Sequence, residues 1–335
     1  MKHYQYICMA ALATALVTFT SCDYSEDQLE PSNNLTSYQL PEGTHDYDDS
    51  IQKFYNNYGV YLLYNFTEKY AYWTPSGWKK GEAATDSTSG SDGFIVKNAD
   101  QNYVKQQLSL LNEVWFSRLN DAAKKKLLPT MILLCSEVDQ MQTKYIYSPS
   151  FRMVYAPKPV YAHYNYDNIC VTYGSSAAIN ITANDKKAFR KQLFEEWAQY
   201  ISEHKAIPSD EFTTSVNYSS STITKASKPL DCTAVGILNS GYNVSASKDW
   251  LNFILMMMLY PESYLTEDPG NISKWTSWNS YDANWNTVYD YDTNFHGILN
   301  PAKDVNGILK ERYQMVRQYF INNFNFDLQS IGNNQ

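Results

Sequence analysis

The chain has 335 residues and a formal net charge of −8 at pH 7. This acidic balance, with no basic run in the sequence, argues against nucleic-acid binding. An apolar content of 44% supports a folded core, and the length suits one large domain or two modest ones. After the N-terminus, the longest apolar stretch, Trp250–Tyr260, is too short to span a membrane and predicts a buried helix.

The N-terminal residues have the pattern of an export signal. Lys2 lies in a short start without acidic residues, and Ile7–Phe19 is almost wholly apolar or small. Two small residues then precede Cys22, which resembles the lipobox of bacterial lipoproteins. We expect residues 1–21 to be a signal peptide and Cys22 to be the lipidated residue. The alternative is an ordinary secretory signal with a chance cysteine.

A polar, acidic segment follows this cysteine, with Asp23, Glu26, Asp27 and Glu30 close together. Such a segment cannot bury a core, so residues 22–46 are predicted to form a flexible tether. The segment also resembles the acidic export signal of some surface lipoproteins. We therefore expect a lipid anchor in the outer membrane of a Gram-negative cell, with the protein exposed at the cell surface.

Residues 47–330 are expected to form a single domain. Helices are predicted at Asp49–Asn57, Gln101–Leu119, Asp185–His204 (capped by Asn184), Ser247–Tyr260 (capped by Ser247) and Ala302–Phe324. Strands are predicted at Val60–Phe66, Leu128–Val138, Asn168–Tyr173 and Ala178–Ile181. Loops or irregular stretches are predicted at Pro75–Asp92, Ser209–Asp231 and Thr266–His296. Strands come early and helices late, which is an α+β layout.

Three cysteines accompany Cys22 in the mature chain, so at least one of the three is unpaired within it. Cys135 lies in an apolar run and is expected to be buried in a strand. A disulfide between Cys170 and Cys232 is left open. No Cys/His spacing indicates a structural zinc site.

The predicted helix around residue 195 carries the residues that bear on chemistry. The segment Glu195-Glu196-Trp197-Ala198-Gln199 resembles the HExxH helix of zincin metallopeptidases. In that motif two histidines one turn apart bind zinc, and the glutamate acts as general base toward the metal-bound water. Glu196 matches the base, whereas Glu195 and Gln199 replace the two histidines.

Further segments follow in an order and rough spacing that resemble one family, the substrate import-associated zinc metallohydrolase lipoproteins. These segments are Tyr58-Gly59, Leu128–Ser136, His204–Pro208, Gly236–Tyr242, Ser247–Asn252 and the closing helix within Gly307–Leu328. The resemblance covers most of the mature chain. It implies a zincin-like metallopeptidase fold with a mixed N-terminal sheet and a mainly helical C-terminal half. It also implies partnership with a TonB-dependent importer and its substrate-binding lipoprotein.

The family's third metal ligand is also replaced here. The family segment that matches Lys248–Asn252 reads Glu-Asp-Phe-Ala-Glu and supplies a carboxylate to the metal. Its glutamates fall on Lys248 and Asn252, and only Asp249 remains, which is expected in a nearby cleft. Zinc is the cofactor of active relatives, and we expect none in this chain. The oxygen donors left on the helix would suit Ca²⁺ or Mg²⁺ better.

Three functions are compatible with these observations. The first is a non-catalytic surface lipoprotein that binds a peptide, a glycan or a partner protein and assists substrate import. The second is an active metallohydrolase with an atypical metal site. The third is a carbohydrate-binding lipoprotein, suggested by the many tyrosines, although these also suit an ordinary core.

Replacing Cys22 by Ser is expected to move the protein from the membrane fraction to the soluble fraction, because thioether attachment of the lipid needs that sulfur. Fractionation followed by a high-salt wash measures this. A Cys22→Ser protein that stays with the membrane would contradict the lipoprotein prediction.

Overall fold

The computed structural model describes residues 39–219, 228–239, 244–281 and 287–334. Cys22 and the predicted signal peptide therefore lie outside the described residues. No helix in the described part is both long enough and apolar enough to cross a membrane. The unit that contains the folded body is Leu40–Gln335. It begins earlier than predicted, because the Glu42 carboxylate accepts hydrogen bonds from the backbone N–H groups of Tyr64 (2.7 Å) and Asn65 (3.3 Å).

A mixed six-stranded sheet forms the N-terminal half. Its strands are β1 (Tyr61–Leu63), β4 (Phe94–Asn98), β5 (Met131–Ile146), β6 (Arg152–Pro159), β7 (Ala162–Asn165) and β8 (Asn168–Val171). The main path runs β1-β5-β8-β7, and β4 and β6 also pair with β5. Strands β1 and β8 are parallel to β5, whereas β4, β6 and β7 pair antiparallel. The short β7 is thus the end of the main path, beyond β8.

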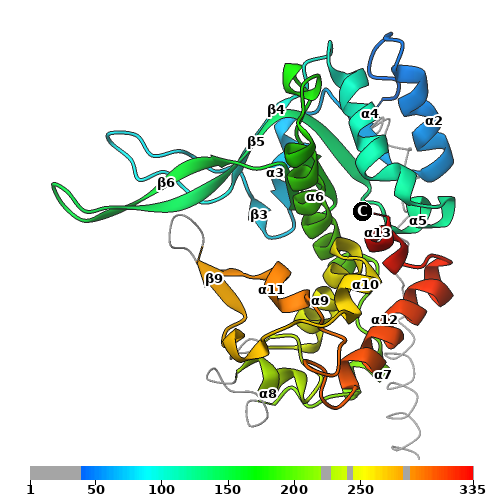
Figure 1. Cartoon of the computed structure of the whole chain (residues 1–335). Coiled ribbons are helices and arrows are strands. Elements are labelled where there is room, and N and C mark those ends of the chain that lie inside the picture. Colours follow the sequence, from blue (N-terminus) through cyan, green and yellow to red (C-terminus); the bar gives the residue numbers. More distant parts are fainter. Residues whose placement is uncertain (1–38, 220–227, 240–243, 282–286, 335) are drawn as a thin grey trace, which may run out of the picture. The chain divides into compact units, whose positions relative to one another are not determined.

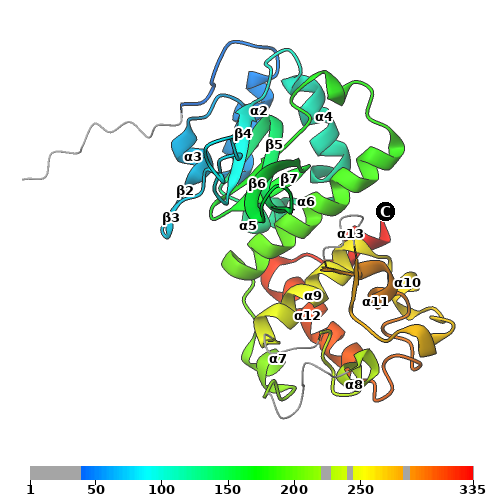
Figure 2. The ribbon, with the colours of Figure 1, turned by 90° about the vertical axis from the view of Figure 1, so that its left-hand side faces the viewer.

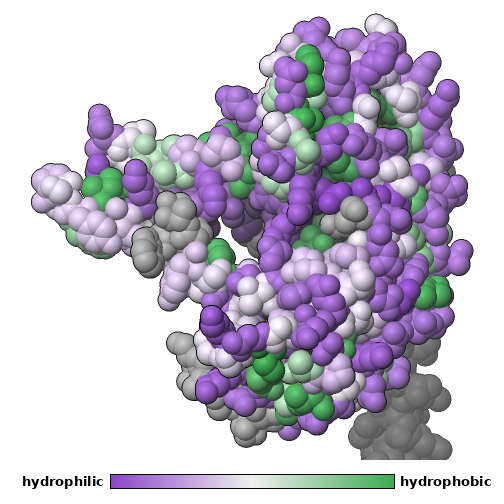
Figure 3. Space-filling view, in the orientation of Figure 1, coloured by the Kyte–Doolittle hydropathy of each residue, from purple (hydrophilic) through white to green (hydrophobic). Residues whose placement is uncertain are grey.

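Strands β5 and β6 extend from the body as a two-stranded arm, which projects to the left in Figure 1. The sequence prediction ended this strand at Val138, but β5 continues to Ile146, because its residues from Asp139 onward pair with β6. The end of the arm carries four exposed apolar side chains, Tyr145, Tyr147, Phe151 and Met153. Apolar residues near the end of the arm appear in green in Figure 3.

Short helices surround the sheet before the long central helix. They are α2 (Asp48–Tyr58), α3 (Glu68–Tyr72), α4 (Val104–Val114), the 3-10 helix η1 (Phe116–Arg118) and α5 (Asp121–Leu127), and a small ribbon is formed by β2 (Trp73–Thr74) and β3 (Gly77–Trp78). Helix α2 ends at Gly59, whose φ of +71° is the left-handed conformation that glycine adopts without strain. This turn leads the chain directly into β1.

Helix α6 (Ala183–His204) is the longest helix among the described residues. The Thr182 side chain caps it by accepting from the Asp185 N–H, so the predicted cap at Asn184 is wrong. Trp197 is fully buried, lies 5.4 Å from the ring of Trp115 and donates from Nε1 to the Leu127 carbonyl (2.8 Å). One face of α6 is therefore fixed against the sheet half.

The C-terminal half is mainly helical. It contains α7 (Asp210–Thr214), α8 (Pro229–Thr233), α9 (Ala246–Leu259), α10 (Glu262–Thr266), η3 (Ile272–Lys274), the ribbon of β9 (Asn279–Tyr281) and β10 (Thr287–Tyr289), α11 (Tyr291–Phe295), α12 (Ile308–Phe324) and α13 (Gln329–Asn333). Figure 2 shows this half below the sheet half, with α6 running between them. Helix α9 is almost wholly buried and packs against α6, α12 and α13.

The structure confirms the α+β layout and corrects several details. The segment predicted as a strand at Ala178–Ile181 is instead the 3-10 helix η2 (Ser176–Ala178) and the turn after it, with η2 capped by the Ser175 hydroxyl. The predicted loop Ser209–Asp231 contains α7 and the start of α8, and the irregular stretch Thr266–His296 contains β9, β10 and α11. Ser245, not Ser247, caps α9. Cys135, Cys170 and Cys232 are buried free thiols, so the Cys170–Cys232 disulfide is absent from the described structure.

Candidate functional site

A row of polar side chains runs along α6. Its members are spaced four residues apart, so each lies about one turn after the one before it: Lys187, Lys191, Glu195, Gln199 and Glu203. Gln199 is exposed, and its Nε2 donates to Glu203 Oε1 at 2.9 Å. The two positions that replace the zincin histidines, Glu195 and Gln199, thus lie in this row.

Glu196 lies beside this row and has a structural partner. Its Oε2 accepts a hydrogen bond from the backbone N–H of Tyr164 in β7 at 2.7 Å. One turn earlier, Gln192 Oε1 accepts from the Tyr161 N–H at 2.7 Å. These two α6 side chains satisfy backbone donors at and just before β7, which would otherwise be open to another strand. The residue at the general-base position therefore holds the sheet against α6.

Burial raises the pKa of both adjacent carboxyl groups to about 7. For Glu195 the charge of Lys191 opposes this rise, and Asp292 adds to it. For Glu196 the Tyr164 N–H opposes the rise, and the charge of Glu195 adds to it. Each carboxyl group is thus close to half-protonated at neutral pH, where it can both donate and accept hydrogen bonds.

Residues from α11 face this carboxyl pair. Burial and the charges of Glu195 and Glu196 together raise the pKa of Tyr291. Lys191 Nζ lies 5.7 Å from the centre of the Tyr291 ring and 3.9 Å from Asp292 Oδ1. The sequence analysis missed Tyr291 and Asp292, because they lie in a stretch that was predicted as irregular and has no recognisable motif.

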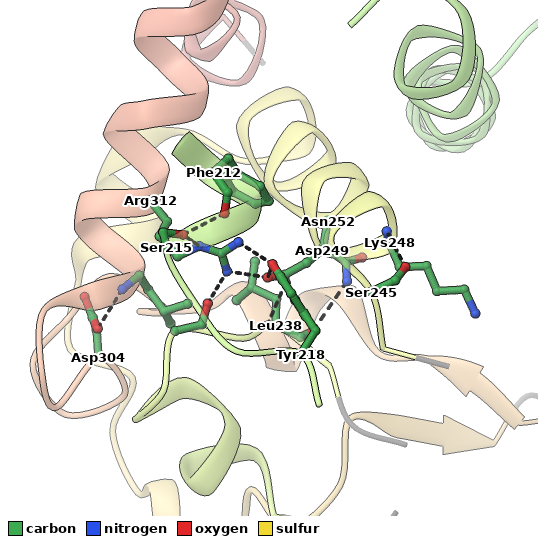
Figure 4. Close-up of polar contacts among 12 residues, drawn as sticks. Phe212, Ser215, Tyr218, Leu238, Ser245, Lys248, Asp249, Asn252, Asp304 and Arg312 are labelled. Carbon is green, nitrogen blue, oxygen red and sulfur yellow. Dashed lines mark hydrogen bonds and ion pairs between the residues drawn. The ribbon is translucent and has the colours of Figure 1, made fainter. Parts of the chain in front are cut away.

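Asp249 occupies a different environment from the predicted cleft. It is 1% exposed, forms an ion pair with Arg312, and accepts from the Leu238 N–H and the Tyr218 hydroxyl, both at 2.9 Å (Figure 4). The prediction that Asp249 lines a cleft is therefore wrong. A buried carboxylate requires a partner, and this one is fully enclosed by donors.

Arg312 completes this buried cluster. Its guanidinium also donates to the Gly236 carbonyl, the Ser215 hydroxyl (3.0 Å) and the Tyr218 hydroxyl. The sequence analysis missed Arg312, although its position three residues after Leu309 and four before Val316 places it on the apolar side of α12. A charged residue at such a position indicates a buried partner.

Lys248 and Asn252, the other two positions that match metal ligands in the resemblance, lie in different environments. Lys248 is exposed, and its side chain points away from the Asp249–Arg312 pair (Figure 4). Asn252 is buried, and its Nδ2 lies 3.5 Å from the Leu238 carbonyl, to which the Tyr289 hydroxyl also donates (2.8 Å). The Lys248 ammonium cannot ligate a cation, and the Asn252 amide is directed at backbone.

These residues do not fit zinc. A zinc site needs three or four nitrogen, sulfur or carboxylate donors around one point. Gln199 donates to a neighbour, and Glu196 and Asp249 are bonded to protein groups. Within the described ranges, no group of three His, Cys, Asp or Glu side chains could hold a metal.

His163, His204 and His296 each contact another side chain. His163 packs 4.2 Å from the Phe94 ring, and burial lowers its pKa to about 4. His204 Nε2 is 2.6 Å from the Tyr164 hydroxyl, and His296 is paired with Glu267 at 2.7 Å.

Arg312→Met is expected to lower the free energy of unfolding by about 3–5 kcal/mol, because it leaves the Asp249 carboxylate buried without its cation. Urea unfolding measures this. Arg317→Met, which removes two more exposed ion pairs on the same helix, with Asp327 and Glu262, should cost less, about 1–2 kcal/mol. Adding Asp249→Asn to Arg312→Met should recover much of the loss, and equal losses for both arginines would contradict the assignment.

Glu195→Gln is expected to stabilise the protein at pH 8 but hardly at pH 5. The folded-state pKa of about 7 lies above the unfolded value near 4.5, so the wild type loses stability as pH rises between these values. The amide removes this loss, worth about 1–3 kcal/mol at pH 8. Urea unfolding at both pH values tests it, with the exposed Glu211→Gln as control. A gain in the free energy of unfolding that is the same at both pH values would contradict a raised pKa of Glu195.

Comparison with protein-family models gives no match, and comparison with curated proteins gives none. Among solved structures, the chain is similar to a crystal structure of a "putative zinc-binding metallo-peptidase" from Bacteroides caccae. The identity is 10% and the TM-score 0.40, over 87% of this chain and 92% of that chain. This similarity is too low to assign either a fold family or an activity.

Proposed function

We propose that the protein is a surface lipoprotein with a zincin-like body that binds a ligand beside α6 and does not catalyse hydrolysis. This proposal rests on one observation: residues at the motif positions are already bonded to other groups of the protein. Glu196 accepts from the backbone of β7, and Asp249 is enclosed with Arg312. A general base has to reach a water molecule or substrate proton, and a metal ligand has to reach the metal.

Ligand binding is supported by the polar groups around the carboxyl pair. Glu195 and Lys191 lie one turn apart on α6, and Asp292 and Tyr291 lie opposite them on α11. This arrangement offers both hydrogen-bond donors and acceptors, and it needs no metal to do so. A peptide or a glycan would suit these groups.

The lipid anchor at Cys22 and the outer-membrane location rest on the sequence pattern alone. Partnership with a TonB-dependent importer and its substrate-binding lipoprotein rests on the family resemblance. The exposed apolar end of the β5–β6 arm supports a protein partner, because such side chains are common at interfaces. Co-purification from detergent-solubilised outer membranes tests this. Loss of the importer from the preparation with Tyr147→Ser/Phe151→Ser would support a role for the arm, and absence of any importer would refute the partnership.

The purified protein is expected to bind no stoichiometric zinc and to cleave no peptides. Amide and carboxylate oxygens are harder ligands than imidazole, so zinc is disfavoured at this site. Without a metal to lower its pKa, water is a poor nucleophile at neutral pH. Elemental analysis after dialysis against micromolar zinc measures the metal content, alongside a peptidase assay.

The variant that decides between the two leading functions is Glu196→Gln. The amide keeps an oxygen that can accept from the Tyr164 N–H, so the fold should be preserved. One zinc per chain in the wild type, with hydrolysis that is lost in Glu196→Gln, would establish the active metallohydrolase instead.

A further inference from the structure

A cavity of about 560 Å³ lies next to the carboxyl pair. Helix α6 supplies Lys187, Arg190, Lys191 and Phe194 to its lining; the segment from the end of α9 into α10 supplies Leu259, Tyr260, Pro261 and Tyr264; and α11 supplies Asp292. Lys191 and Asp292 belong to both the cavity and the carboxyl site. The volume is within the range of pockets that hold small ligands.

The cavity is positively charged in an acidic protein. Its described lining contains three cations, at positions 187, 190 and 191 on one side of α6, against one carboxylate, Asp292. Burial, and to a smaller extent the Arg118 cation, lower the pKa of Arg190. The chain as a whole carries −8, so this local charge favours an anionic ligand.

The wall formed by the end of α9 and by α10 is largely apolar. The rings of Tyr260 and Tyr264 stack on each other there, with centroids 4.9 Å apart and planes 13° apart. The Tyr260 hydroxyl donates to Asp292, so this phenol is held in place. The carbon atoms of these two rings give the apolar side of a ligand ring a surface to pack against.

Asp292 favours a sugar acid over an aromatic acid as the anionic ligand. Its side chain is 71% exposed beside Lys191, so it can accept hydrogen bonds from hydroxyl groups while it repels a second carboxylate. An aromatic acid has no hydroxyl groups to offer it, whereas a sugar acid does.

We propose that this cavity binds a uronic acid unit of an acidic glycan. The carboxylate lies toward Lys187 and Lys191, the apolar side of the sugar ring packs against Tyr260 and Tyr264, and hydroxyl groups donate to Asp292. The inference deepens the proposed function, since it names the ligand class of a non-catalytic binding protein.

Isothermal titration at low salt tests this with galacturonate and glucuronate as probes, galactose and glucose as neutral controls, and benzoate as a carboxylate without hydroxyl groups. At least one uronate should bind at least tenfold more tightly than its neutral sugar. Affinity should fall as salt rises from about 20 to about 300 mM, because screening weakens the attraction to the partly exposed cations.

The variant Lys187→Met/Lys191→Met should weaken uronate binding at least tenfold, and Lys187→Met alone should weaken it measurably. Lys186→Met is the matched control: it removes the same charge from the same turn, but Lys186 is paired with Glu113 at 2.8 Å and does not line the cavity. Thermal unfolding checks that all three variants are folded.

No uronate binding, or binding that the double variant leaves unchanged, would overturn the proposal. Benzoate binding as tightly as the uronates would overturn the assignment to a sugar acid. Failure of the proposed function has a separate readout, since zinc-dependent peptide hydrolysis would refute it whatever the titrations with uronates give.

Discussion

Helix α6 packs against the sheet and α9 at the same time, and this packing determines what each of its side chains can do. Its apolar residues are buried between the two halves of the protein. Gln192 and Glu196 point to the backbone at β7, Glu203 accepts from the Tyr164 hydroxyl of β7, and Lys187 and Lys191 line the cavity. A side chain that points to β7 cannot also serve a ligand in the cavity, so the helix geometry itself separates structural from ligand-facing residues.

One physical requirement explains why Glu196 and Asp249 are both bonded to other groups of the protein. An ionised carboxylate in a protein interior needs a metal, a cation or several hydrogen-bond donors. With Glu195 and Gln199 in place of histidines, α6 offers no pair of imidazole ligands for zinc. Glu196 accepts from one backbone donor and has a pKa that burial raises to about 7, whereas Asp249 is paired with an arginine. Histidines at positions 195 and 199 alone would not create a zinc site, because Asp249 would still be enclosed with Arg312.

The sequence could predict the features that depend on local patterns. The long helices α6 and α9 were predicted within three residues at each end, α6 from its regular apolar spacing and α9 from its nearly continuous apolar run. The strands β4, β6 and β7 were missed because they are short or carry many polar residues, and they are stabilised by pairing with β5 or β8. The contact between Glu196 and β7, and the pairing of Asp249 with Arg312, join residues 32 and 63 positions apart. No local pattern contains that information.

The tyrosine content of the chain cannot by itself indicate a ligand-binding function. Many of the 29 tyrosines serve the interior, where a buried phenol needs a hydrogen-bond partner. Tyr64 donates to Asp48, and Tyr313 donates to Gln329, both within the core. Tyr260 and Tyr264 have the same chemistry but lie on the wall of a charged cavity. The difference between a core residue and a recognition residue is therefore set by where the chain places the ring, and here the cations of α6 opposite the rings make the cavity selective for an anion.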